Sequence, residues 1–131
     1  MAAVVVNGGK QRISERMRGL GTEPAYLQWG TGAGTAAVAD TGLFSTATTT
    51  EVRTLGTTSQ VTVTQTSDGW RVVGTITALG ARTILEVGLF DGAGSGGPPP
   101  TGANFFVHAD HGSTTLAVND AIQYTITVQF T

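Results

Sequence analysis

The segment that decides the fold is DAIQYTITVQFT, which runs from Asp120 to Thr131. Every second position is apolar, and Gln or Thr fills the positions between. The apolar residues are Ile122, Tyr124, Ile126, Val128 and Phe130. Successive side chains of a strand point to opposite faces, so the alternation predicts a strand with one face on a core and one in water. Strands of this kind are typical of antiparallel sheets.

A β-hairpin is predicted upstream of this strand. SQVTVTQ (59–65) alternates Val with polar residues, and WRVVGTITAL (70–79) follows after the turn sequence TSDG (66–69). Asp68-Gly69 supplies the turn, because Gly tolerates positive φ. The apolar positions that share one face of the return strand are Trp70, Val72, Ile76 and Ala78.

Four further strands are predicted at 25–30, 44–55, 82–91 and 103–110. Between the last two lies GAGSGGPPPTG (92–102), whose Gly and Pro content is incompatible with a helix or a central strand, so a projecting, flexible surface loop is expected there. The fold class is therefore mainly β: an antiparallel β-sandwich, jelly-roll-like in architecture, with one short N-terminal helix. We expect an N-terminal arm over 1–22 and one sandwich domain over 23–131.

The helix is predicted within residues 9–21, GKQRISERMRGLG. Ile13, Met17 and Leu20 form a narrow apolar stripe, Asn7 is a candidate cap, and Gly19 or Gly21 ends the helix. Four of the seven basic residues lie here, beside Glu15: Lys10, Arg12, Arg16 and Arg18. Two interpretations stay open: a docking element for an acidic partner surface, or a solvated helix face.

The amino-acid composition excludes several kinds of site and argues against several kinds of partner. The 131 residues include no cysteine, which excludes disulfides, cysteine-type zinc sites and a cysteine nucleophile. Seven basic and nine acidic residues give a net charge of −2, without the basic surplus typical of nucleic-acid binders. No apolar run is long enough for a membrane helix, and MAAVVV lacks the basic start of a secretory signal. We expect a soluble product made in the cytoplasm, with no nucleic-acid or membrane partner.

The sequence offers few candidates for chemistry. GTGAG (30–34) has Thr where the dinucleotide fingerprint needs its third Gly, and no amphipathic helix follows. VHADHG places His108, Asp110 and His111 together; they converge on a metal only if the strand ends at Ala109, and otherwise they enter a turn. No G-x-S-x-G nucleophile elbow is present. We therefore expect no catalytic residue, no cofactor and no metal.

A glycoside-cleaving or carbohydrate-binding sandwich is the alternative from another class. The carboxylates Glu51, Glu86, Asp91 and Asp110 are available for such chemistry. A sugar platform would need Trp29 or Trp70, and Trp70 is expected in the core because it alternates with Val72.

Glu86 lies in TILEVGLFDG (83–92), and its environment bears on this alternative. Strict alternation places Leu85, Val87 and Leu89 on one face and Ile84, Glu86, Gly88 and Phe90 on the other. We predict that Glu86 makes a structural hydrogen bond or ion pair on a semi-buried sheet face, with Arg53, Arg71 or Arg82 as candidate partners. Asp91 is expected to open the Gly-rich turn that follows.

Four stretches together resemble a family of small tailed-bacteriophage virion proteins. They are WGTG at Trp29 to Gly32, DTGL at Asp40 to Leu43, ILEVGLFD at Ile84 to Asp91, and the closing stretch from Val118 to Phe130. The resemblance covers roughly residues 20–131.

The resemblance implies a structural virion component without enzymatic activity. Capsid cement (decoration) proteins are one such class; they lie on the outer capsid surface as dimers or trimers and bridge major capsid protein subunits. Tail or fibre-associated proteins are the other. The interaction candidates carried forward are Lys10, Arg12, Arg16, Arg18, Trp29, Glu86 and Asp91.

Overall fold

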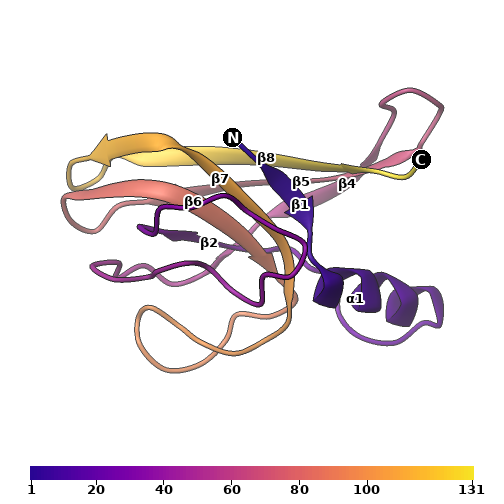
Figure 1. The fold of residues 1–131 in the computed structure, drawn as a ribbon, viewed down its shortest axis with the longest axis horizontal. Coiled ribbons are helices and arrows are strands. Elements are labelled where there is room, and N and C mark those ends of the chain that lie inside the picture. The colour runs from indigo at the N-terminus through magenta and orange to yellow at the C-terminus, as the bar shows by residue number, and fades with distance from the viewer.

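The structure is a computed structural model that describes all 131 residues. It contains eight strands and one helix: β1 (Ala3–Val5), α1 (Asn7–Met17), β2 (Tyr26–Gly30), β3 (Thr54–Leu55), β4 (Thr57–Val61), β5 (Gly69–Thr77), β6 (Arg82–Phe90), β7 (Phe105–Leu116) and β8 (Ala121–Gln129). The strands form an antiparallel five-stranded sheet in the order β1-β7-β6-β2-β3 and a three-stranded sheet in the order β4-β5-β8. Figure 1 shows these two layers, with α1 at one end.

The core lies between the two sheets and confirms the predicted β-sandwich. The five-stranded sheet contributes Leu27, Trp29, Val87 and Leu89 among others, and the three-stranded sheet contributes residues such as Val72. Apolar burial of this kind contributes about 25 cal/mol per Å² removed from water, so the face-to-face contact is the main stabilising term of the fold.

The C-terminal alternation is confirmed from Ile122 to Val128, whereas Phe130 follows the end of β8 and is 53% exposed. β8 pairs with β5 without interruption, from Gly69↔Gln129 to Thr77↔Ala121. Tyr124 is buried, and Ile122, Ile126 and Val128 are half-buried against the core. The β4–β5 hairpin is confirmed as well, but the predicted turn at Asp68-Gly69 is wrong, because Gly69 already pairs with Val61 in β5 and the positive φ of 60° belongs to Ser67. Its connection is longer than predicted, because the carboxylate of Asp68 accepts hydrogen bonds from the N–H groups of three loop residues that precede it.

The predicted strand over 44–55 is wrong, apart from its last two residues. Its N–H groups bond to side-chain carboxylates instead of a strand ladder: Phe44 and Ser45 donate to Glu86, and Thr50 donates to Glu51. Residues 31–53 consequently form a long loop. Its residues 43–45 lie against Glu86 and Gly88, on the face of the five-stranded sheet that points away from the core.

The N-terminal segment differs from the predicted arm in three respects. Residues Ala3–Val5 form β1, which pairs with β7 at the edge of the sheet. The helix follows Val6, and Asn7 makes no capping bond. Of the predicted apolar stripe only Ile13 packs on the core, whereas Met17 is 84% exposed and Leu20 is 50% exposed. No helix has the length and apolar character needed to cross a membrane.

Candidate functional site

Glu86 is completely buried, deeper than the semi-buried position predicted. Its carboxylate accepts hydrogen bonds from the N–H groups of Phe44 (2.9 Å) and Ser45 (3.0 Å), and it lies 2.8 Å from Nε2 of His108. The predicted structural role fits these contacts. The predicted arginine partners are wrong, because Arg53 and Arg82 bond elsewhere and Arg71 lies on β5 in the other sheet.

The strict alternation predicted for 83–91 is also wrong, and the reason is a β-bulge. The β6–β7 register shifts between Ile84 and Glu86. Leu85 stands opposite three residues of β7, 111–113, so the extra residues lie on β7 and not on β6. At this irregularity Ile84 faces the core with Val87 and Leu89, while Glu86 points to the opposite face. The bulge therefore separates the carboxylate from the apolar side chains around it in sequence.

His108 connects this carboxylate to the loop. Its Nδ1 lies 2.6 Å from Oδ2 of Asp40, and its Nε2 faces Glu86. Both ring nitrogens lie within hydrogen-bond distance of a carboxylate, so the imidazole joins β6 and β7 to the 31–53 loop. Asp40 also accepts the N–H of Ala37, and this bond, with the hydrogen bond and charge of His108, holds the pKa of Asp40 below its usual value against the effect of burial.

His108, Asp110 and His111 do not converge on one point. Asp110 accepts the N–H groups of Ala2 and Ala36, and His111 contacts the hydroxyl of Tyr124. No group of three His, Cys, Asp or Glu side chains is arranged to hold a metal ion. Each of the three residues instead joins β7 to a different segment of the chain.

A second buried polar cluster surrounds Trp29, which is 1% exposed and cannot stack against a sugar. Its indole N–H donates to Glu51, which also pairs with Arg82 at 3.0 Å and accepts the N–H groups of Thr50 and Leu79. Burial alone would raise the pKa of Glu51, but these hydrogen bonds and the Arg82 charge together lower it below its usual value.

The 92–102 loop is fixed at its base. Asp91 accepts both the backbone and side-chain N–H groups of Asn104, and Arg53 donates to the carbonyl groups of Gly92 and Gly102. Asp91 thus lies at the start of the loop, as predicted, and its carboxylate joins the two ends.

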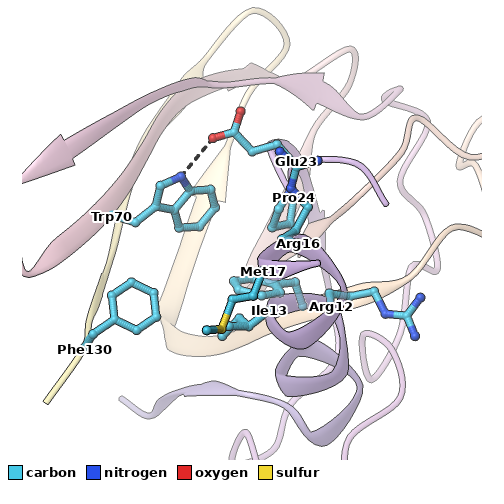
Figure 2. Close-up of a pocket in the computed structure, with 9 residues that line it drawn as sticks. Arg12, Ile13, Arg16, Met17, Glu23, Pro24, Trp70 and Phe130 are labelled. Carbon is cyan, nitrogen blue, oxygen red and sulfur yellow. Dashed lines mark hydrogen bonds between the residues drawn. The ribbon is translucent and has the colours of Figure 1, made fainter. Parts of the chain in front are cut away.

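A surface groove lies between α1 and the three-stranded sheet. Figure 2 shows Trp70 and Phe130 facing Ile13 and Met17 across it, with Arg12 directed away. The floor includes Phe106, which meets Trp70 edge to face at 5.7 Å between ring centroids. Phe130 is 53% exposed and Met17 is 84% exposed, so the groove carries apolar surface open to solvent. The prediction that Trp70 is a core residue is correct only in part, because it also lines this groove.

The predicted basic residues lie on the helix that forms one wall of the groove. Arg12 pairs with Glu15 at 3.0 Å, and Arg16 donates to the carbonyl of Gly21 at 2.8 Å. Lys10 and Arg18 are exposed at the two ends of the basic segment. Sequence patterning found the charges, but it missed the groove because Trp70 and Phe130 lie far from the helix in the sequence. Comparisons with protein-family models, curated proteins and solved structures gave no match to the chain.

Acid is expected to destabilise the fold. The pKa values of Asp40, Glu51 and Asp110 are lowered in the folded chain, the last mainly by the N–H of Ala36. A carboxyl group with a lowered pKa stabilises the fold above its unfolded value, and that stability is lost as the pH falls through the folded value. Urea unfolding should therefore give a constant free energy from pH 7 to about 5 and a steep loss below about 4.

The variant Glu51→Gln is the control for this pH dependence. It should be less stable at pH 7, because Arg82 loses its partner, but should lose less further stability between pH 5 and 3. An equal acid loss in both proteins would contradict the assignment of Glu51 to this effect.

Proposed function

We propose that the chain is a non-enzymatic structural component of a bacteriophage virion, and specifically a capsid cement protein that bridges major capsid protein subunits. The observation that carries the proposal is the structural role of the residues that resemble those of the virion family. Trp29, Asp40 and Glu86 are all committed to hydrogen bonds that fasten the 31–53 loop and its neighbours to the five-stranded sheet. The residues shared with the family thus hold the sandwich together, and a cement protein needs a stable domain of this kind.

The sandwich is also held rigidly, as the bridging role requires. The two carboxylates of the Glu86 cluster and the imidazole between them are held by short contacts within the chain. Polar networks whose members are all satisfied rigidify a fold. A jelly-roll-like sandwich of this kind, on the outer surface of the capsid, would resist the shear between neighbouring subunits that it bridges.

The groove beside α1 is the surface that we assign to the major capsid protein. Its apolar walls suit an apolar side chain of the partner, and the cations of α1 suit acidic residues that flank it. Arg53 and Arg82 are buried in internal contacts, so the helix carries most of the positive charge available to a partner. The docking interpretation of Lys10, Arg12, Arg16 and Arg18 is thereby preferred, with Arg16 lining the groove and the guanidinium of Arg12, paired with Glu15, directed away from it.

Repetition on the shell makes weak contacts effective. Many copies of a cement protein bind to one capsid. Self-association into a dimer or trimer, as the resemblance implies, lets one oligomer bind several capsid subunits at once. Linking sites in this way raises the overall affinity by about 10²–10⁴ without any new kind of contact.

Co-sedimentation with expanded, undecorated capsids tests the proposal. The purified chain should pellet with these capsids and saturate at a fixed ratio to the major capsid protein. A chain that stays in the supernatant at saturating capsid concentration would overturn the cement assignment. Labelled antibody that marks only the tail of intact virions would assign the chain to the tail or fibre instead.

The variant Met17→Glu tests the groove. Met17 is exposed, so the fold should be unchanged, but capsid binding should weaken by about tenfold because an apolar contact is lost and like charge is added near acidic partner residues. The matched control is Val118→Glu, since Val118 is 57% exposed and lies in the β7–β8 turn, at the opposite end of β8 from Phe130. Equal binding by both variants would place the contact elsewhere.

A further inference from the structure

β8 is an edge strand with one neighbour. The three-stranded sheet has the order β4-β5-β8, so the nine residues Ala121–Gln129 pair with β5 on one side and leave the other side open. The remaining edges are shorter: β1 has three residues, β3 has two and β4 has five. Figure 1 shows β8 as the long yellow strand at the margin of the molecule.

The register identifies which backbone groups face the open side. Phe130 donates its N–H to Asp68, and Ala78 donates its N–H to Asp120, so the even-numbered positions that bracket β8 bond to β5 and its extensions. The pairing between them has no register shift. Backbone groups of an antiparallel strand alternate between its two sides, and the odd positions therefore direct N–H and C=O away from β5. These positions are Ala121, Gln123, Thr125, Thr127 and Gln129.

This edge lacks the features that usually prevent strand addition. Natural sheet edges are protected by Lys, Pro, bulges or short length. β8 is long and regular and contains no charged residue and no Pro. On its inner face Ile122, Ile126 and Val128 are only half-buried, at the opening of the sandwich beside β1.

The strand is also complementary to itself. An antiparallel pairing of two β8 strands about a two-fold axis at Thr125 places Tyr124 opposite Ile126 and Ile122 opposite Val128 of the second copy. On the wet face it places Thr125 opposite Thr125 and Gln123 opposite Thr127. Apolar meets apolar, polar meets polar, and no like charges face each other, which are the cross-strand pairs that stabilise sheets.

We propose that two copies of the chain associate through β8, so that their three-stranded sheets join into one continuous six-stranded sheet. The odd positions exchange N–H···O bonds across the axis, and the half-buried inner-face residues of each copy cover those of the other. A closed two-fold contact uses the same patch on both copies and ends with the dimer. The inference rests on β8 alone and is independent of capsid binding.

Cysteine cross-linking tests both the edge and the register. The chain has no cysteine, so each variant introduces the only thiol. In Thr125→Cys the two Cα atoms lie about 5.5 Å apart across the axis, a distance that a disulfide spans. In the control Gln123→Cys they lie about 14 Å apart, because the residues are four positions out of register. Mild oxidation should give a covalent dimer of Thr125→Cys within minutes and leave Gln123→Cys monomeric on a non-reducing gel.

A charge test measures the same dimer without a cross-link. Light scattering should give twice the chain mass for the unmodified protein at micromolar concentration. Thr125→Lys places two ammonium groups opposite each other and should give the monomer mass with an unchanged circular dichroism spectrum. The control Ser59→Lys, exposed on the β4 edge of the same sheet, should remain a dimer.

Three results would overturn the proposal: a monomeric unmodified protein at high micromolar concentration, equal cross-linking of the two cysteine variants, or dissociation by Ser59→Lys and not by Thr125→Lys. A dimer that forms as described while the chain fails to pellet with capsids would leave the proposal standing and reject the cement function, so the two can fail separately.

Discussion

Replacing Glu86 with Ala is expected to lower the free energy of unfolding by about 3–5 kcal/mol, the usual effect of removing one partner from a buried charged contact. The carboxylate accepts three donors at once: the N–H groups of Phe44 and Ser45 and Nε2 of His108. All three lose their acceptor in the variant, and water has no access to Glu86 or His108, which are both fully buried. Urea unfolding at pH 7 measures the change.

The more conservative variant Glu86→Gln separates shape from acceptor capacity. Gln has nearly the same volume, but its amide group has one accepting oxygen and one donating NH₂. One of the three donors must then face another donor, so we expect a loss of about 1–3 kcal/mol. The size of the residue alone would predict almost no change. A Glu86→Gln protein as stable as the original would contradict the structural role of this carboxylate.

Amide hydrogen exchange gives an independent readout of the same cluster. The N–H groups of Phe44 and Ser45 should exchange faster in Glu86→Gln, because their acceptor is weakened. The N–H groups along β5 and β8 should keep their relative order of protection, since Glu86 contacts neither strand. Protection lost equally throughout the chain would indicate global unfolding and not a local role at the loop.

The sequence predicted those parts of the fold that depend on local alternation. β5 and β8 each have one face on the core and one in water, so their faces could be assigned from the order of apolar and polar residues along the sequence. The same rule fails in β6 at Leu85, where the register with β7 shifts because β7 carries extra residues. No feature of TILEVGLFDG marks this shift, because it depends on the pairing with β7.

The polar cluster around Glu86 could not be predicted from the sequence either, but the reason is different. Asp40 and His108 are 68 positions apart, and Glu86 and Ser45 are 41 apart. The Thr-rich segment 44–55 has high strand propensity, but tertiary contacts override it because Glu86 and Glu51 take the N–H groups that a strand would need. A buried Glu without an arginine partner requires a loop that supplies N–H groups, and sequence patterning does not reveal which loop does so.

The groove beside α1 illustrates the same limit at the surface. Helical periodicity predicted that Met17 and Leu20 belong to a buried stripe, because it assumes that the helix lies along its whole length on the core. The helix instead contacts β7 near its N-terminal end, and its later turns leave the body of the sandwich. The apolar side chains at that end are consequently available to a partner.

Gly9→Ala is expected to release α1 from the sandwich, with a loss of about 2–3 kcal/mol, as is typical of overpacked sites. Gly9 is the buried residue of the helix, and an added Cβ would overlap the carbonyl group of Phe106 on β7. That carbonyl also accepts the N–H of Val6, just before the helix. Neither backbone can move without breaking this bond, so the helix has to tilt or detach.

The adjacent variant Gly8→Ala is the matched control. A Cβ at Gly8 would lie 3.5 Å from the carbonyl oxygen of Phe105, an ordinary contact. Because Ala favours helix more than Gly does, Gly8→Ala should keep or raise the stability by about 0.5 kcal/mol. The two variants make the same chemical change one residue apart. Thermal unfolding followed by circular dichroism should show a lower melting temperature for Gly9→Ala and an equal or higher one for Gly8→Ala.

Under the proposed function, the pair also tests whether capsid binding depends on the helix. The groove exists only while Ile13 and Met17 are held opposite Trp70 and Phe130. In Gly9→Ala the indole of Trp70 should become more exposed, with a red-shifted fluorescence emission, and capsid binding should weaken together with it. Gly8→Ala should match the original chain in both measurements. If Gly9→Ala shifts the fluorescence while binding is unchanged, the capsid contact lies away from α1, and the other faces of the sandwich become the surfaces to test.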